Sequence, residues 1–127
     1  MVKLKLVLDS NVFKSREFCR WLLSKKEEKY LPAIAYMEYL EHHLKKGNTE
    51  SMVDAFLEQM NITIVPFGKE EAAQEAKSST KNPDNQNMRN YAIGATAISI
   101  GAQLVTNNQE NFKWMDNVLT PDDIMEK

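Results

Sequence analysis

Short apolar runs alternate along the chain with segments whose apolar positions recur every three to four residues. This alternation is typical of β-strands that are followed by α-helices. It predicts strands at residues 4–8, 31–35, 62–65 and 103–106, with 118–119 as a candidate fifth strand. Pro32 limits the second strand to an early or edge position. We therefore expect an α/β fold, a three-layer α/β/α domain with a central, mainly parallel sheet of four to five strands.

The segments between these strands have the marks of helices. We expect helices over residues 15–29, 36–44, 69–77 and 88–100, and another that begins at residues 49–51. Gly47 and Gly101 follow two of them, as is common where helices end. Residues 78–87 are polar and contain Pro83, which predicts a loop, and residues 121–125 predict a terminal turn. No repeat or long linker divides the chain, so residues 1–127 are expected to form a single domain.

Composition and charge exclude several classes of protein. The chain has 16 Lys and Arg against 18 Asp and Glu, a net charge of -2, which argues against a basic nucleic-acid coat but leaves room for a local basic patch. No apolar run is long enough for a membrane span or a signal peptide. The single cysteine, Cys19, cannot form an internal disulfide and fits a core thiol in a reducing cytoplasm.

Polar side chains follow two of the predicted strands. Asp9 ends the first apolar run, and residues 107–111 follow the run at 103–106. Ligands of parallel α/β sheets gather at the carboxyl ends of the strands, so these positions are candidates for a functional site. A carboxylate such as Asp9 must be capped, paired or bound to a cation if it is buried, and a helix N-cap is the simplest alternative to a ligand.

Glu38 is the second candidate acid. Apolar residues flank it closely in the predicted helix, which is unusual for a solvated glutamate. His42 lies four residues further on and shares a helix face with it. This pair has a spacing that suits a metal ion, although a simple surface pair is the commoner outcome of such a spacing.

Four segments of the chain, residues 7–13, 33–40, 90–97 and 104–112, occur in an order that resembles the PIN domain. The likeness is strongest to VapC-type toxins and related archaeal and bacterial PIN proteins, and it spans nearly the whole chain. The first two segments contain Asp9 and Glu38 at the positions of the family's metal-binding acids. The last two are similar to its third and fourth motifs, with Asn90, Asn108 and Asn111 at or near the positions of further acids.

The resemblance implies an acidic cluster that holds Mg²⁺ or Mn²⁺ for hydrolysis of RNA phosphodiesters. Hard divalent cations favour carboxylate oxygens, and a bound cation activates water. The implied metal ligands are Asp9 and Glu38, with catalytic positions also at Asn90, Asn108 and Asn111. The implied substrate-binding residues are Ser10, Arg89, Thr106 and Asn107. Lys81, Lys113 and Trp114 are further candidates for RNA contact, and solvated charge with a core tryptophan is the alternative.

The sequence departs from the family where acids are expected. Asn90 stands in place of an Asp in the third motif, and Asn108 and Asn111 stand where the fourth normally supplies one. An amide offers an oxygen but no charge, and each lost charge weakens the attraction of a cation by up to about 4 kcal/mol before solvation offsets it. The protein is then a natural inactive homologue, an engineered inactive form, or a one-metal enzyme with a stray acid. The stray candidates are Asp84, Glu110 and Asp116.

The resemblance therefore predicts a divalent-metal-dependent ribonuclease of the PIN toxin type with reduced or lost activity. The alternative is a catalytically inactive PIN-like module that binds RNA or a protein partner, and an unrelated doubly wound domain is a third interpretation. The family also implies a small antitoxin protein as partner and a homodimer in the cytoplasm.

Overall fold

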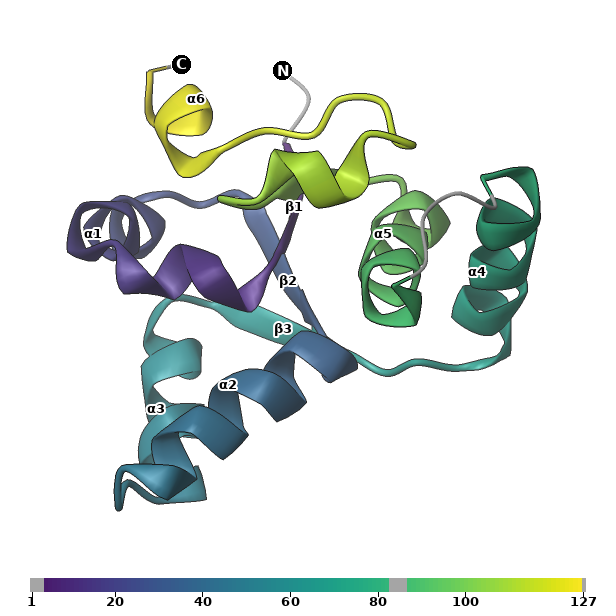
Figure 1. The fold of residues 1–127 in the computed structure, drawn as a ribbon. Coiled ribbons are helices and arrows are strands. Elements are labelled where there is room, and N and C mark those ends of the chain that lie inside the picture. The colour runs from purple at the N-terminus through teal and green to yellow at the C-terminus, as the bar shows by residue number, and fades with distance from the viewer. Residues whose placement is uncertain (1–3, 83–86, 127) are drawn as a thin grey trace.

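Four parallel strands form the central sheet in the order β3-β2-β1-β4 (Figure 1). The structure is a computed structural model that describes residues 4–82 and 87–126. The strands are β1 (Lys5–Leu8), β2 (Glu28–Pro32), β3 (Ile62–Val65) and β4 (Gln103–Val105). Each neighbouring pair is parallel, so the carboxyl ends of all four strands lie at one edge of the sheet.

Helices flank this sheet, which confirms the expected α/β class. They are α1 (Arg16–Ser24), α2 (Ala33–Lys45), α3 (Glu50–Gln59), α4 (Lys69–Lys81), α5 (Met88–Ile100) and α6 (Pro121–Met125), with short 3-10 helices η1 (Ser10–Lys14) and η2 (Gln109–Phe112). In Figure 1, α5 and α4 pack side by side at one side of the sheet, and α1 lies at the other. The helices α2 and α3 form a pair next to β2 and β3.

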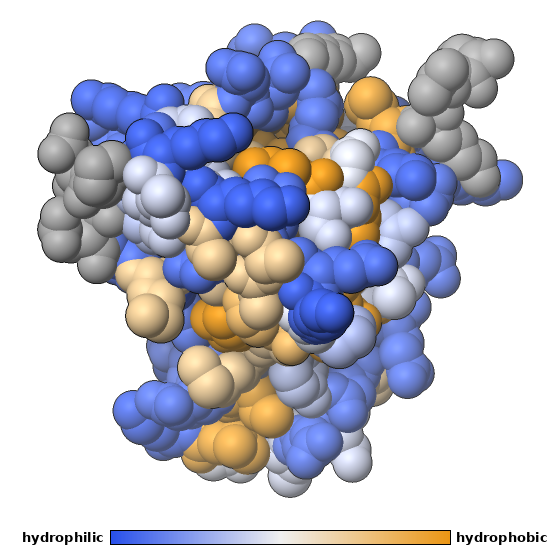
Figure 2. Space-filling view, turned by 90° about the vertical axis from the view of Figure 1, so that its right-hand side faces the viewer, coloured by the Kyte–Doolittle hydropathy of each residue, from blue (hydrophilic) through white to orange (hydrophobic). Residues whose placement is uncertain are grey.

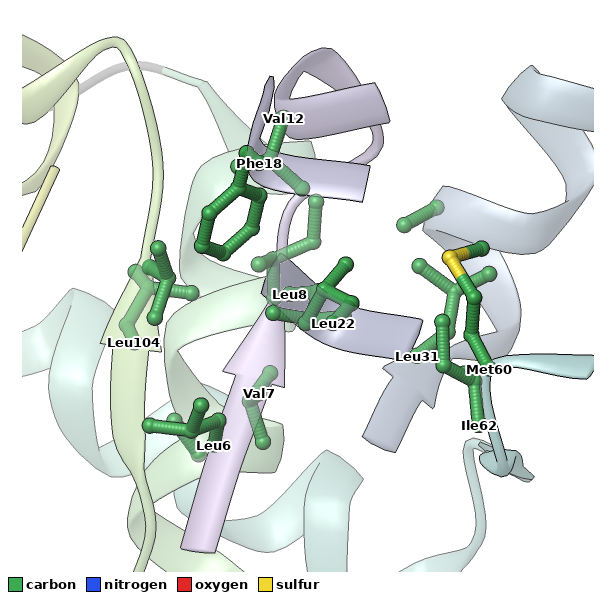
Figure 3. Packing of buried hydrophobic residues seen from close by; sticks show 14 of the residues in the cluster. Leu6, Val7, Leu8, Val12, Phe18, Leu22, Leu31, Met60, Ile62 and Leu104 are labelled. Atoms are coloured by element: carbon green, nitrogen blue, oxygen red, sulfur yellow. The ribbon is translucent and has the colours of Figure 1, made fainter. Parts of the chain in front are cut away.

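The hydrophobic core surrounds β1, one of the two inner strands of the sheet. Leu6, Val7 and Leu8 are completely buried, because helices cover both faces to which successive side chains point. Figure 3 shows Phe18 and Leu22 of the α1 segment packing near this strand. Burial of each such side chain is worth about 1.5–3 kcal/mol.

Several large hydrophobic side chains are exposed at the surface of the described residues. Figure 2 shows one face, on which hydrophilic residues surround smaller groups of hydrophobic ones. The exposed large apolar residues come from α1, α2, α3, α5 and connecting segments, and they are Leu4, Leu23, Met37, Leu44, Met52, Phe67, Met88 and Ile98. No described helix is long and apolar enough to cross a membrane.

Gly94 of α5 allows the segment after η2 to lie directly against this helix. A Cβ atom at Gly94 would be 2.6 Å from both Met115 Sδ and Trp114 Cη2, which is too close for any side chain. The Trp114 ring also packs on Tyr91, with ring centroids 5.0 Å apart. These contacts favour the interpretation of Trp114 as a packing residue over a contact with bases.

The expected helix over residues 15–29 is confirmed as far as Ser24 and is wrong over residues 25–29. Helix α1 ends at Ser24, and residues from Glu28 onward form β2. The strand is favoured because it pairs with both β1 and β3. Lys29 is buried in it and donates hydrogen bonds from Nζ to the carbonyl oxygens of Leu22 at 2.5 Å and Lys25 at 2.8 Å. It thereby satisfies carbonyl groups at the end of α1.

Other boundaries also differ from those expected. Strand β2 lies inside the sheet, not at its edge, and Pro32 is tolerated there as its last residue. Residues 33–35 belong to α2, which begins directly after Pro32. Helix α4 continues to Lys81, so residues 78–81 are helical instead of a loop, while residues 83–86 lie outside the described residues. Leu119 forms an isolated parallel bridge to Val105 in place of a fifth strand.

Candidate functional site

Asp9 lies directly after β1 and is almost completely buried, with 1% of its surface exposed. It occupies the N-cap position of η1, but its side chain makes no capping hydrogen bond there. Its Oδ2 instead accepts hydrogen bonds from Thr106 Oγ1 at 2.9 Å and from Asn11 Nδ2 at 3.3 Å. The simple N-cap interpretation of Asp9 is therefore wrong, and the carboxylate belongs to a polar cluster at the end of the sheet.

Asn11 connects this cluster to the loop after β4. Its Nδ2 also donates to Thr106 Oγ1 at 3.2 Å, and its Oδ1 accepts from the backbone N–H of Asn107 at 3.1 Å. Asn107 Nδ2 donates back to the carbonyl oxygen of Asn11 at 3.1 Å. Sequence reasoning did not single out Asn11 as a site residue. Its place two residues after a strand-ending acid was the available signal.

Arg89, in the first turn of α5, bridges the two candidate acids. Its Nη2 donates to Asp9 Oδ1 at 2.7 Å, and its Nε donates to Glu38 Oε2 at 2.6 Å. Its Nη1 donates to Asn90 Oδ1 at 3.0 Å. Burial acts to lower the pKa of Arg89, but the hydrogen bonds and charges of Glu38 and Asp9 outweigh it and raise that pKa. The guanidinium is thus held as a cation between two carboxylates.

Glu38 reaches the cluster from α2 and is 35% exposed at its side chain. Its Oε1 is buried and has no hydrogen-bond partner among the described residues. The charged partner of Glu38 is Arg89. His42, one turn further along α2, is exposed and has its ring beside that of His43.

The asparagines predicted for the site lie at different depths. Asn90 is 3% exposed and contributes its side-chain oxygen to the cluster through Arg89. Asn108 is exposed and joins the cluster through its backbone, whose N–H donates to Thr106 Oγ1 at 3.1 Å. Asn111 is half-buried in η2, and its backbone N–H donates to the carbonyl oxygen of Asn108 at 3.1 Å. The structure therefore brings Asp9, Glu38 and Asn90 together, with Asn108 adjacent.

The remaining candidates lie around this cluster or away from it. Ser10 lines the neighbouring groove described below. Lys113 forms an exposed ion pair with Glu110 at 2.8 Å, which engages one of the stray acids. Asp116 is exposed, and Asp84 lies outside the described residues.

A groove of about 410 Å³ opens beside Glu38, between η1 and α2. Phe13 and Tyr39 contribute aromatic rings to it, with centroids 4.8 Å apart. Lys14 and Lys46 line it as exposed side chains, and neither belongs to an ion pair within the described residues. The groove therefore combines aromatic surface with uncompensated positive charge, next to the acidic pair.

The comparisons with known proteins identify the family. The family model described as PIN domain matches residues 6–117. The chain belongs to the PIN domain family. This match covers most of the chain and includes the candidate acids and asparagines of the site. No curated protein sequence matches the chain.

Several solved structures share the PIN fold with this chain. A toxin-antitoxin complex from Klebsiella pneumoniae has 20% identity and a TM-score of 0.75 over 92% of this chain and 98% of that one. DNA-bound VapBC from Salmonella typhimurium has 18% identity and a TM-score of 0.70, covering 92% and 96%. FitAcB from Neisseria gonorrhoeae has 23% identity and a TM-score of 0.71, covering 91% and 95%. These similarities establish the fold, and the first of these structures is a toxin-antitoxin complex.

PIN domains typically use a divalent metal, and the residues of this site do not fit one as they are arranged. Six or more oxygen ligands surround Ca²⁺, and Mg²⁺ requires octahedral oxygen coordination that usually includes carboxylates. Among the residues that the structure describes, only two carboxylates meet here, both are ion-paired with Arg89, and Asn90 adds no charge. Within the described residues, no three His, Cys, Asp or Glu side chains form a metal-binding group.

Proposed function

We propose that this PIN domain is a toxin-type RNA-binding protein whose metal-dependent hydrolysis of RNA is weak or absent. The observation that carries the proposal is the acid deficit of the site. Asp9 and Glu38 meet at the carboxyl ends of the strands, but the third side chain in the cluster is the neutral Asn90. Two carboxylates leave little charge to attract and hold a divalent cation.

The groove beside Glu38 supports RNA as the ligand. Lys14 and Lys46 offer two cations for backbone phosphates, and binding of phosphates by lysine releases counterions. Tyr39 and Phe13 offer aromatic surface on which unpaired bases stack, at about 1–3 kcal/mol per base. Glu38 is one of the residues that line the groove, so a strand bound there would lie beside the acidic pair.

A small antitoxin protein is proposed as the protein partner. The support is the fold shared with a chain of a solved toxin-antitoxin complex. The homodimer implied by the family resemblance stays a prediction.

A second candidate, an active metal-dependent ribonuclease, is favoured by one observation. Glu38 Oε1 is buried without a hydrogen-bond partner among the described residues, and such an oxygen is available as a ligand. Asp9 and Glu38 would be its metal ligands. This candidate requires Arg89 to leave the carboxylates, because both are engaged by its guanidinium.

Two assays on one sample test the proposal. Single-stranded RNA binding is measured by fluorescence anisotropy across a salt series, and RNA cleavage is measured with Mg²⁺ and with Mn²⁺. The double variant Lys14→Gln/Lys46→Gln should bind RNA at least tenfold more weakly. The logarithm of its binding constant should also fall less steeply with the logarithm of the salt concentration, with a slope smaller by about 0.7 for each phosphate that lysine no longer neutralises. The matched control is Lys69→Gln/Lys77→Gln on α4, which removes the same charge from exposed positions outside the groove.

Three results would contradict the proposal. Equal loss of binding in the groove and control variants would show that RNA does not use the groove. No RNA binding at low salt would favour a module that binds only protein. Rapid cleavage that disappears in Asp9→Asn would establish the second candidate, the active ribonuclease.

A further inference from the structure

Arg89 occupies the space between the carboxylates of Asp9 and Glu38. Three different nitrogen atoms of its guanidinium donate to three different side chains, at 2.7 Å to Asp9, 2.6 Å to Glu38 and 3.0 Å to Asn90. These acceptors come from the end of β1, from α2 and from α5. Two of these three acceptors are carboxylate oxygens, the type of ligand that divalent cations also favour.

Asp9 requires a positive partner because it is buried. Its Oδ2 accepts hydrogen bonds from Thr106 and Asn11, which are neutral, so the charge of the carboxylate is compensated at Oδ1 by Arg89. An isolated buried carboxylate is strongly disfavoured, and arginine supplies a charge that is present at all ordinary pH values. The protein therefore carries its own counter-ion for this acid.

The same guanidinium opposes the binding of a metal ion. A divalent ion on Asp9 and Glu38 would lie within a few ångströms of Arg89, where like charges repel strongly. It would also have to take over the oxygens Asp9 Oδ1 and Glu38 Oε2, to which Arg89 donates. Of the four carboxylate oxygens of Asp9 and Glu38, only Glu38 Oε1 is left without a partner among the described residues.

The position of Arg89 in the chain helps to hold it there. It is the second residue of α5, and its backbone N–H donates to the Asn87 side chain at 3.0 Å, in the N-cap of the helix. Its side chain is 28% exposed, so part of the guanidinium-bearing side chain faces solvent while the three hydrogen bonds hold it on the cluster.

We infer that Arg89 takes the place of the divalent cation in this PIN site, and that its removal opens a site for one metal ion on Asp9 and Glu38. This inference deepens the proposed function, because it rests on the same acid-poor cluster and names what keeps the metal out. Asn90 and Thr106 would remain beside the opened site with their side-chain oxygens.

The test is a titration of Mn²⁺ into the full chain. Binding is measured by calorimetry and by the electron paramagnetic resonance signal of free Mn²⁺. The variants are Arg89→Gln, which removes the charge, and Arg89→Lys, which keeps it. The double variant Arg89→Gln/Asp9→Asn shows whether any gained site includes Asp9. Circular dichroism and thermal melting establish that each variant is folded.

We expect Arg89→Gln to bind one Mn²⁺ at least tenfold more tightly than the unmodified chain. Arg89→Lys should stay close to the unmodified chain, and the double variant should lose the gain. Added Mn²⁺ should also raise the melting temperature of Arg89→Gln more than that of the unmodified chain, since a ligand that binds the folded state stabilises it.

Two results would overturn the inference. One is a folded Arg89→Gln that binds Mn²⁺ no better than the unmodified chain. The other is tight binding of one Mn²⁺ by the unmodified chain, if Asp9→Asn abolishes this binding. This second measurement does not need the Arg89→Gln variant, so it tests the inference even if that variant does not fold. RNA binding by the Lys14 and Lys46 variants is an independent measurement, so a failure of the proposed function is distinguished from a failure of this inference.

Discussion

Thr106 donates a hydrogen bond from its buried hydroxyl to Asp9 Oδ2 at 2.9 Å, across 97 residues of sequence. The contact follows from the pairing of β1 with β4, in which Leu8 is the parallel partner of Val105. Asp9 then follows directly after β1, and Thr106 follows directly after β4. The backbone N–H of Asp9 donates to the carbonyl oxygen of Val105 at 3.0 Å. Two adjacent strand ends thus position a carboxylate and its hydroxyl donor.

Replacing Thr106 by Val should destabilise the fold. The substitution keeps the shape of the side chain but removes the donor to Asp9 and the acceptor for the Asn108 backbone N–H. Loss of a partner for a buried polar group costs about 1–3 kcal/mol in the free energy of unfolding. Urea denaturation measures this change. Thr106→Ser retains the hydroxyl and is the matched control, and an equal loss of stability in both variants would contradict the role assigned to the hydrogen bond.

Introducing Asp at Asn90, together with Asp at Asn108 or Asn111, should strengthen Mn²⁺ binding and raise RNA cleavage. Each change adds one negative charge at or beside the acidic pair, and a charge at 4 Å in an effective dielectric near 20 is worth up to about 4 kcal/mol before solvation offsets it. We expect at least a tenfold gain in Mn²⁺ affinity by calorimetry, and a larger gain when Arg89→Gln is combined with the change.

The control for this charge effect is Asn61→Asp. Asn61 follows α3, is exposed, and has a positive φ of 57° that Asp also tolerates. Asn61→Asp adds one negative charge outside the cluster, half of what the paired site changes add, so the gain in affinity is compared per added charge. An affinity for Mn²⁺ that rises no further in the site variants than in this control would show that the acid deficit does not limit metal binding.

Gly94→Ala should destabilise the protein by roughly 1–3 kcal/mol, the usual cost of overpacking a filled site. The new methyl group would collide with the Trp114 ring and with Met115 Sδ, which lie 2.6 Å from its position. Gly68→Ala is the comparison, because its methyl group would meet only the flexible Glu71 Oε1 at 3.3 Å. Thermal melting of both variants tests the prediction, and a Gly94→Ala protein as stable as Gly68→Ala would contradict it.

Tyr36 should make stability depend on pH in the alkaline range. Its hydroxyl donates to Asp54 Oδ1 at 2.6 Å, and this hydrogen bond, with burial and the charges of Asp54 and Glu50, raises the pKa of Tyr36 to about 12. The folded pKa is above the unfolded value of 10, so the stabilisation is complete below pH 10 and is lost as the pH rises toward 12.

Urea denaturation between pH 9 and pH 11.5 measures this effect for the unmodified chain and for Tyr36→Phe. Phe cannot ionise, so the difference in stability between the two proteins should shrink as the pH rises. Other alkaline titrations affect both proteins equally and cancel in the comparison. A difference that is constant across this range would mean that the Tyr36–Asp54 hydrogen bond does not contribute in the folded state.

Local sequence signals determined much of the fold. The β-branched run at residues 62–65 has the same bounds in the structure as in the prediction. Gly101 ends α5 with a φ of 68°, the left-handed conformation that favours glycine after a helix. Thr49 caps α3 by accepting a hydrogen bond from the Met52 backbone N–H. Each of these features depends on residues only a few positions apart, so a sequence pattern can predict them.

The region around β2 depended on contacts that are distant in sequence. The sequence pattern predicts that the helix of α1 continues beyond Ser24. Residues 28–32 are instead stabilised more by pairing with β1 and β3 than they would be by extending the helix. Lys29 appears in the sequence as an ordinary surface charge. Its burial is possible only because the end of α1 presents two carbonyl oxygens to it, and burial lowers its pKa.

The sequence by itself determined which residues are candidates for the site, because Asp9 and the residues after β4 follow apolar strands and parallel strands end at one edge. Only the tertiary structure decided what Arg89 does. In the sequence it is a cation at the start of a helix, equally suited to solvent or phosphate. The fold brings it to Asp9 and Glu38, which are 80 and 51 residues away in the sequence. Two carboxylates at hydrogen-bond distances of 2.7 Å and 2.6 Å attract the guanidinium more strongly than water does.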